Sequence, residues 1–306
     1  MKLNKLFWAL GVLVLPLGLY SCGSDDDDAK GDDTVYEYEE PVNKANAARF
    51  TFEAEDSPVQ SVAFGETNTA VIQTQDEEDG SVEYVIGTYS KTGGTYIVDT
   101  PKGTYTFAFE SEDPVENSGI QHVQCAVTTP QQPQAVTASA TVTTSSNTGA
   151  DIDLFRTWYP FRTALNLQKQ GTKGLVTDEL EGIDFEALKA RAEKEGCHIK
   201  EDLTGWKVET VFFQGTGEFG VNFINDKSYF ATWRLLNSNG DMDFDWKDKE
   251  SIKNEFVNDA KVNASVYKTG AYKGECWLRL KSEVEQDNGE VWDVEVIFRL
   301  IGHKLK

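Results

Sequence analysis

Residues 104–109 read TYTFAF, and this short alternation of small and aromatic side chains decides the fold class. Successive side chains of an extended strand point to opposite faces. The aromatic residues therefore share one face and the small ones the other: Tyr105, Phe107 and Phe109 against Thr104, Thr106 and Ala108. A pattern of period two predicts an antiparallel strand with one buried and one solvated face.

The same alternation recurs from Ala47 to the end of the chain, and turn dipeptides separate its runs. Asp-Gly, Gly-Gly, Asn-Gly and Asn-Gly stand at 79–80, 93–94, 239–240 and 288–289. The sequence therefore predicts a mainly β protein built from antiparallel β-meanders or barrels. Prolines and a run rich in Thr and Ser follow Thr128, so we expect two consecutive β domains, 47–144 and 151–306.

One helix is predicted after residue 151, from Asp184 to Glu195. Asp184 is a good N-cap residue, and Gly196 can end the helix. Phe185, Leu188 and Ala192 share one face of it.

The two halves also show a distant similarity. VQSVAF at 59–64 matches VETVFF at 208–213, and GTY at 87–89 matches ATW at 231–233. Short strands resemble one another by chance, so both an internal duplication and coincidence remain open.

The N-terminus has the features of a secretory signal. Lys2 and Lys5 precede an apolar run that ends in Leu19-Tyr20-Ser21-Cys22. This segment resembles the lipobox of bacterial lipoproteins, which implies cleavage of residues 1–21 and acylation (palmitate) of Cys22. The alternative is an uncleaved anchor helix with an incidental thiol.

An acidic segment follows Cys22. Residues 22–46 are poor in aliphatic side chains and include Asp25 to Asp28, so we expect a disordered tether. The acidic block after the cysteine resembles the export signal of Bacteroidota-type surface lipoproteins. That resemblance implies an outer-membrane protein that is lipid-anchored and exposed at the cell surface.

The net charge and the cysteines exclude several classes of protein. The formal charge is −22, and removal of residues 1–21 leaves 27 basic against 51 acidic side chains. This excess disfavours nucleic acid, whose phosphates need a basic surface. Cys125, Cys197 and Cys276 then remain, too few for a disulfide framework, although one pair stays open.

The second half, from Asp151 to Gly302, resembles lipocalin-like barrels. The resemblance rests on Trp158 in the first predicted strand and Arg299 in the last. It implies barrel closure with the Arg299 guanidinium packed over the Trp158 indole, and a cup for a small apolar or glycan-like ligand. The chain departs from the family pattern because it lacks a clean Gly-x-Trp and inserts the helix after the first strand.

Aromatic residues supply the candidate binding sites. Trp277 shares the polar face of its strand with Arg279, and Tyr272 lies just before that strand, so both are candidate stacking platforms. The alternative is a Trp277 packed under a loop or against the other domain. Trp233 and Trp292 fall on apolar faces and either fill the core or line a cavity together with neighbouring phenylalanines, Phe223 and Phe298.

Catalytic and metal-binding signatures are weak. None of His122, His198 and His303 lies in a nucleophile or zinc motif. The alternating aspartates at 241, 243 and 245 permit a calcium site, but their spacing favours the solvated face of a strand. We therefore expect no enzyme, no cofactor and no metal.

These observations lead to two hypotheses about function. The first is a non-catalytic surface module that binds a small apolar ligand or a glycan. The second is a structural or adhesive subunit, or an assembly partner of an outer-membrane protein complex, which needs only an exposed edge or patch. The two differ in whether the second domain encloses a cavity or fills it with the same side chains, Trp233, Phe223, Trp292 and Phe298.

Overall fold

The computed structural model describes residues 47–53, 57–75, 82–112, 114, 122–144, 150, 152–200, 202–225, 227–246 and 260–303. The predicted signal peptide, Cys22 and the predicted tether lie outside these residues. No helix within the described ranges is long and apolar enough to cross a membrane.

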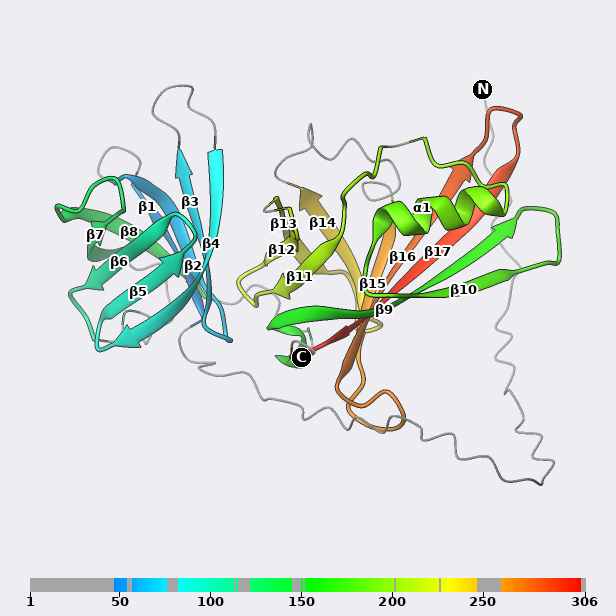
Figure 1. Cartoon of the computed structure of the whole chain (residues 1–306). Coiled ribbons are helices and arrows are strands. Elements are labelled where there is room, and N and C mark those ends of the chain that lie inside the picture. The colour runs from blue at the N-terminus through cyan, green and yellow to red at the C-terminus, as the bar shows by residue number, and fades with distance from the viewer. Residues whose placement is uncertain are drawn as a thin grey trace, which may run out of the picture. The chain divides into compact units, whose positions relative to one another are not determined.

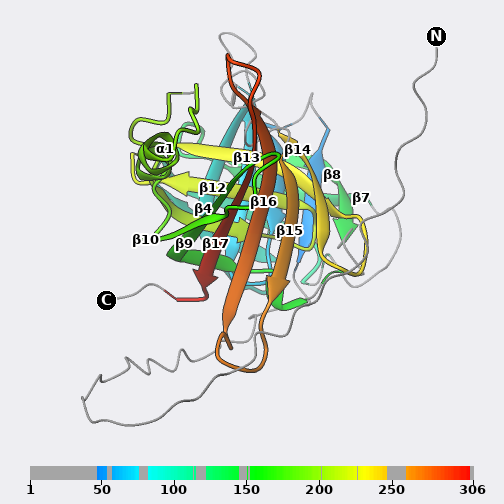
Figure 2. The ribbon, with the colours of Figure 1, turned by 90° about the vertical axis from the view of Figure 1, so that its right-hand side faces the viewer.

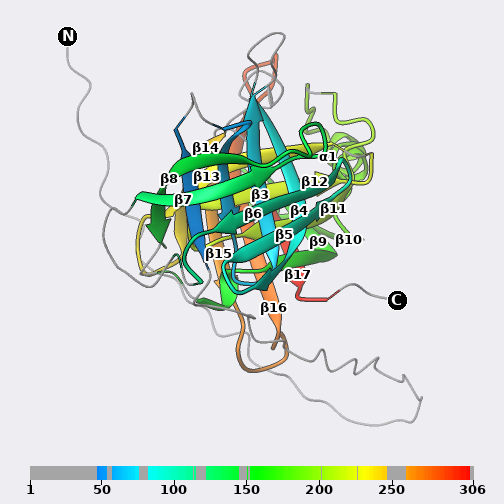
Figure 3. The ribbon, with the colours of Figure 1, turned by 90° about the vertical axis from the view of Figure 1, so that its left-hand side faces the viewer.

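Eight strands of the first half form a closed antiparallel barrel in chain order (Figure 1). They are β1 (Ala48–Phe52), β2 (Val59–Phe64), β3 (Thr69–Gln75), β4 (Val82–Thr92), β5 (Thr95–Thr100), β6 (Gly103–Phe109), β7 (His122–Thr128) and β8 (Val136–Thr144). Pairing of β1 with β8, from Ala48↔Thr144 to Phe52↔Ala140, closes the ring. Figure 3 shows β5 to β8 from the outside of this barrel.

Aromatic rings fill the first barrel. The predicted alternation in TYTFAF is confirmed, because Tyr105, Phe107 and Phe109 are buried. Phe64 and Tyr96 lie at the centre with ring centroids 4.1 Å apart. Large rings at alternating positions of neighbouring strands leave an interior of packed side chains.

The second half forms another antiparallel barrel with nine strands and one helix. Its elements are η2 (Ile152–Leu154), β9 (Thr157–Lys169), β10 (Val176–Glu181), α1 (Phe185–Lys194), β11 (Val208–Phe213), β12 (Glu218–Phe223), β13 (Ser228–Leu235), β14 (Asp241–Trp246), β15 (Lys261–Val266), β16 (Glu275–Glu285) and β17 (Val291–Ile301). Pairing of β9 with β17 closes eight of the strands into a ring, and β10 pairs with the side of β9. Figure 2 shows the outer faces of β15, β16 and β17.

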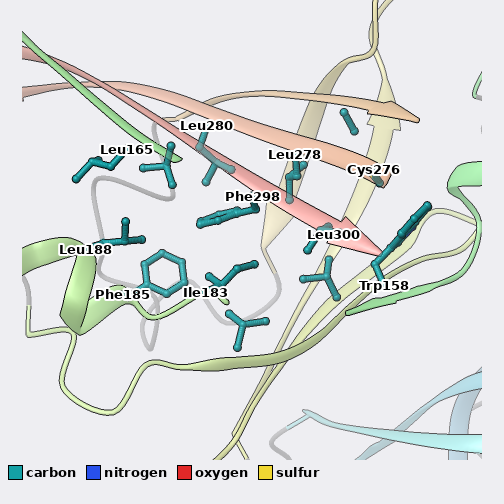
Figure 4. Packing of buried hydrophobic residues seen from close by; sticks show 14 of the residues in the cluster. Trp158, Leu165, Ile183, Phe185, Leu188, Cys276, Leu278, Leu280, Phe298 and Leu300 are labelled. Carbon is teal, nitrogen blue, oxygen red and sulfur yellow. The ribbon is translucent and has the colours of Figure 1, made fainter. Parts of the chain in front are cut away.

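Helix α1 connects β10 to β11, which pair with different parts of β9. β11 pairs with β9 only at Trp158 and Thr157, whereas β10 pairs further along β9. The side chain of Asp184 caps the helix by accepting from the Ala187 N–H, as predicted. Phe185 then packs against Phe298 of β17, with ring centroids 5.6 Å apart (Figure 4).

The helix position differs from the expectation in one respect. The chain first turns back through β10, so α1 follows the second strand and not the first. The acidic run of β10 pairs with β9 along its whole length. Arg191 of α1 forms an ion pair with Asp178 of β10, which joins the helix to this added strand.

The two barrels share one hairpin geometry, which supports the internal duplication. The turn after Phe64 and the turn after Phe213 have equal length, and each has a positive φ at the equivalent position, Asn68 and Gly217. Tyr89 Oη donates to the Gly65 carbonyl at 2.7 Å, and Trp233 Nε1 donates to the Gln214 carbonyl at 3.1 Å. Both matched sequence pairs therefore occupy equivalent places.

The equivalent hairpins, β2–β3 and β11–β12, also contact each other. The Gly215 N–H donates to Glu66 at 3.2 Å, and Gln214 Nε2 donates to the Thr69 carbonyl at 3.0 Å. An apolar cluster of buried residues lies beside these bonds and comprises Ala63, Val71, Phe212 and Phe230. Glu66 is thus a buried acid at the junction of the two barrels.

Candidate functional site

Three aromatic rings gather on the outside of the second barrel. Tyr272 and Trp277 have ring centroids 4.7 Å apart, and Tyr267 lies 4.9 Å from Trp277. We call Tyr267, Tyr272 and Trp277 the outer aromatic cluster. Tyr272 is 41 % exposed, so its ring is accessible from solvent.

Two arginines flank this cluster. The guanidinium of Arg299 lies 5.5 Å from the Trp277 ring and 5.2 Å from the Tyr272 ring. The guanidinium of Arg279 lies 5.3 Å from the Trp277 ring. Cations over aromatic faces attract the π electrons, and they fix the planes of the rings.

A buried carboxylate holds Arg299 in place. Both oxygens of Glu275 accept hydrogen bonds from Arg299, at 2.8 and 2.9 Å. The Trp277 indole N–H donates to the same carboxylate at 2.7 Å. These bonds to Glu275 raise the pKa of Arg299 above its usual value. A second carboxylate, Glu179, accepts from Arg299 at 3.0 Å.

Strand register and one turn bring these groups together. Trp277 of β16 lies directly opposite Arg299 of β17, on the outer face of the wall. The chain between β15 and β16 turns through Gly270 and Gly274, both with positive φ. Left-handed backbone suits glycine, so this turn can fold Tyr272 back over the strand that follows.

The structure brings Trp277 and Tyr272 together, as the stacking-platform hypothesis requires. Trp277 is also partly covered by the turn that carries Tyr272, so the alternative of packing under a loop holds in part. Sequence reasoning missed Tyr267 and Glu275 as members of the site. Glu275 did carry a signal, because it stands two residues before Trp277 and thus on the same strand face.

The predicted stack of Arg299 on Trp158 is wrong. Trp158 points into the barrel and is fully buried, and the guanidinium over its ring is that of Arg156, at 5.5 Å. Arg299 lies on the outer face with Trp277. The barrel does close by pairing of the predicted first and last strands, but through their backbones.

Trp233 and Trp292 are both buried in the second barrel. Trp233 packs against Phe213 and Phe155, and Trp292 belongs to the same core. A cavity of about 60 Å³ lies in this barrel, and its lining is apolar. Phe223 and Phe298 line it, whereas the two tryptophans do not.

The three cysteines among the described residues are buried. Cys125, Cys197 and Cys276 form no disulfide. Burial raises the pKa of Cys125 to about 12 and that of Cys197 to about 11. Both are therefore protonated at neutral pH, and a protonated thiol is a poor nucleophile and metal ligand.

The alternating aspartates of β14 are engaged by neighbouring side chains. Asp241 accepts hydrogen bonds from Asn237 and Asn263, and Asp243 forms an ion pair with Arg234 at 2.6 Å. Among the described residues no group of three or more His, Cys, Asp or Glu side chains is arranged to hold a metal ion.

Comparison with known proteins identifies no family. No family model matches the chain, and no curated protein matches it. Among solved structures, the chain is similar to a double mutant of the vaccine antigen Transferrin Binding Protein B (TbpB) from Haemophilus parasuis Hp5. The alignment has 10% identity and a TM-score of 0.23, and it covers 80% of this chain and 54% of that chain. The chain thus spans about half the length of that protein.

Proposed function

We propose that this chain is a non-catalytic binding protein whose outer aromatic cluster recognises a saccharide. The observation that carries this proposal is the exposed Tyr272 ring held beside Trp277 between two guanidinium groups. Aromatic faces stack on apolar ring surfaces, and neighbouring polar groups bind hydroxyls. A sugar ring presents both kinds of surface.

The interior of the second barrel supports this choice over an apolar ligand. Its apolar cavity of about 60 Å³ is far below the roughly 300–1,000 Å³ of typical small-molecule sites. A larger hollow of about 780 Å³ is lined mostly by polar and charged side chains, which do not suit an apolar ligand. A ligand that entered this barrel would have to displace packed side chains such as Phe185, Phe223 and Phe298. Displacing a packed core costs several kcal/mol, so the outer surface is the better site.

The proposal is tested with Tyr272→Ala. Loss of this ring should weaken the binding of an oligosaccharide by about 1–2 kcal/mol, roughly 5- to 30-fold, because the stacking surface is lost. Screening the full chain on an array of neutral and acidic glycans and titrating the best hit by calorimetry measures this change.

The matched control is Ile224→Ala, which also truncates an exposed apolar side chain of the second barrel but lies outside the cluster. It should leave the affinity unchanged. If no glycan on the array binds the wild-type chain, the saccharide proposal fails, and a structural or adhesive subunit becomes the better hypothesis.

We further propose that Cys22 anchors the protein to the outer membrane. Several acyl chains on one cysteine give durable attachment, whereas a single chain binds only marginally. Cys22→Ala should therefore release the protein from the membrane fraction or leave the uncleaved precursor. Fractionation and mass spectrometry of the N-terminus distinguish these states. A Cys22→Ala protein that stays in the membrane fraction with a processed N-terminus would contradict the anchor.

A further inference from the structure

Arg279 differs from the other arginine of the site in its partners. Its Nη2 donates to the Tyr267 hydroxyl at 3.3 Å, while its Nε is buried and has no hydrogen-bond partner. Within the described ranges no carboxylate lies within ion-pair distance of this guanidinium, whereas Arg299 binds both Glu275 and Glu179. Arg279 is thus a half-buried cation without a counter-ion among the residues that the structure describes.

The residues directly opposite Arg279 on the two neighbouring strands are neutral. Register places Asn263 of β15 on one side and Ile297 of β17 on the other. Beyond Asn263 the nearest strand carries Asp241, whose carboxylate already accepts bonds from two asparagines. Glu275 is likewise saturated by Arg299 and Trp277. Glu295, which lies diagonally across on β17, is paired with Lys281, so each described acid near Arg279 already has a partner.

A guanidinium without a carboxylate partner is matched best by a carboxylate. Its planar N–H groups can form two parallel hydrogen bonds with the two oxygens of one carboxylate. Such bonds are stronger where the donors are partly desolvated, because water competes less. The Trp277 ring lies against the same guanidinium. A sugar ring that stacks on the cluster would therefore bring its own carboxylate within reach of Arg279.

We infer that Arg279 is the anion-binding residue of the outer aromatic cluster and that the ligand is an acidic saccharide, whose carboxylate binds Arg279 while a sugar ring stacks on Tyr272. This inference rests on the proposed function. It adds the charge of the ligand, which neither the aromatic rings nor the negative net charge of the chain would suggest.

Pairs of oligosaccharides that differ only in charge test the inference. Oligomers of galacturonate, glucuronate and N-acetylneuraminate are each titrated into the full chain beside their methyl esters. At least one acid should bind about tenfold more tightly than its ester, because only the acid forms charge-assisted hydrogen bonds. Arg279→Gln should reduce the affinity for that acid to the level of the ester.

Lys281→Gln is the matched control. Lys281 is two residues further along the same face, its side chain is exposed, and it pairs with Glu295 at 3.1 Å. Its loss should not alter the preference for the acid. Arg279→Lys should keep part of the preference, since it retains charge but not the planar donors.

Different outcomes separate the inference from the function it rests on. If acid and ester bind equally and Tyr272→Ala weakens both, the saccharide site stands and the role of Arg279 is refuted. If the preference for the acid survives Arg279→Gln, another cation binds the carboxylate and the inference is wrong. If neither member of any pair binds, both the inference and the proposed function fail.

Discussion

Arg299→Ala should destabilise the second barrel by about 3 kcal/mol and abolish saccharide binding, because it leaves a buried carboxylate without its cation. Glu275 is buried, and two of its hydrogen bonds come from Arg299. The guanidinium also lies over both Trp277 and Tyr272, so its removal frees the two rings to move. The free energy of unfolding in urea, followed by tryptophan fluorescence, measures the loss.

Tryptophan emission reports this barrel specifically. No tryptophan occurs between residues 47 and 144, whereas six of the seven lie after residue 151. The control is the double variant Arg299→Ala with Glu275→Gln, which removes the buried charge but keeps an acceptor for the Trp277 N–H. It should recover part of the lost stability. A single variant that unfolds within about 0.5 kcal/mol of wild type, the range of an ordinary surface substitution, would refute this account of the network.

The second large effect concerns Glu66 and pH. Burial raises the pKa of Glu66 to about 7, although N–H donors at Glu66 and Gly215 oppose this shift. The folded protein therefore holds this proton more tightly than the unfolded chain does. The stabilisation is complete below about pH 4.5 and is lost as the pH rises through 7. A rise of the pKa from 4.5 to about 7 corresponds to about 3 kcal/mol.

Other charged groups face Glu66 from both barrels. Glu218 of β12 repels the ionised form of Glu66. Burial, and after it the nearby Glu66, raises the pKa of Tyr89 of β4. Arg49 of β1 binds Glu218 at 3.1 Å, which offsets part of that negative charge. Ionisation of Glu66 is therefore the main unfavourable charge at the junction.

The difference in stability between wild type and Glu66→Gln reports the titration of Glu66 alone, because glutamine does not ionise. Above pH 7 the variant should be more stable than wild type by about 3 kcal/mol, and the difference should vanish near pH 4.5. Urea unfolding followed by circular dichroism at several pH values measures it. Glu110→Gln, at an exposed side chain of the same barrel, is the control and should show no such trend. A Glu66→Gln difference that does not change with pH would contradict a buried, protonated Glu66 at the junction.

Local patterning predicted the elements of this fold well. Alternation in β6 and the cap, apolar face and closing glycine of α1 each depend on residues close in sequence, so they can be read without tertiary information. Strand β10 was missed because its sequence, VTDELE, is acidic and buries no side chain fully. Its place is set by pairing with β9, which lies beyond local sequence.

The error about Arg299 was avoidable, whereas Arg279 was not predictable. In VEVIFRL the buried residues of β17 alternate with Glu295 and Arg299, so the sequence already places Arg299 on the outer face. A register shift opposite Arg299 and Leu300 separates Trp158 from the rest of β9, and this irregularity has no local signal. The lack of a counter-ion at Arg279 depends on three neighbouring strands, which only the folded barrel reveals.

The most direct test of a ligand site outside a filled barrel is the indole N–H spectrum of the chain labelled with ¹⁵N-tryptophan. The probe is the oligosaccharide that binds most tightly among the acidic and esterified pairs. We predict that the Trp277 signal, assigned with Trp277→Phe, shifts on titration while the signals of Trp206 and Trp246, which line the interior cavity, stay in place. A titration that shifts Trp206 and Trp246 but leaves Trp277 unchanged would contradict the account.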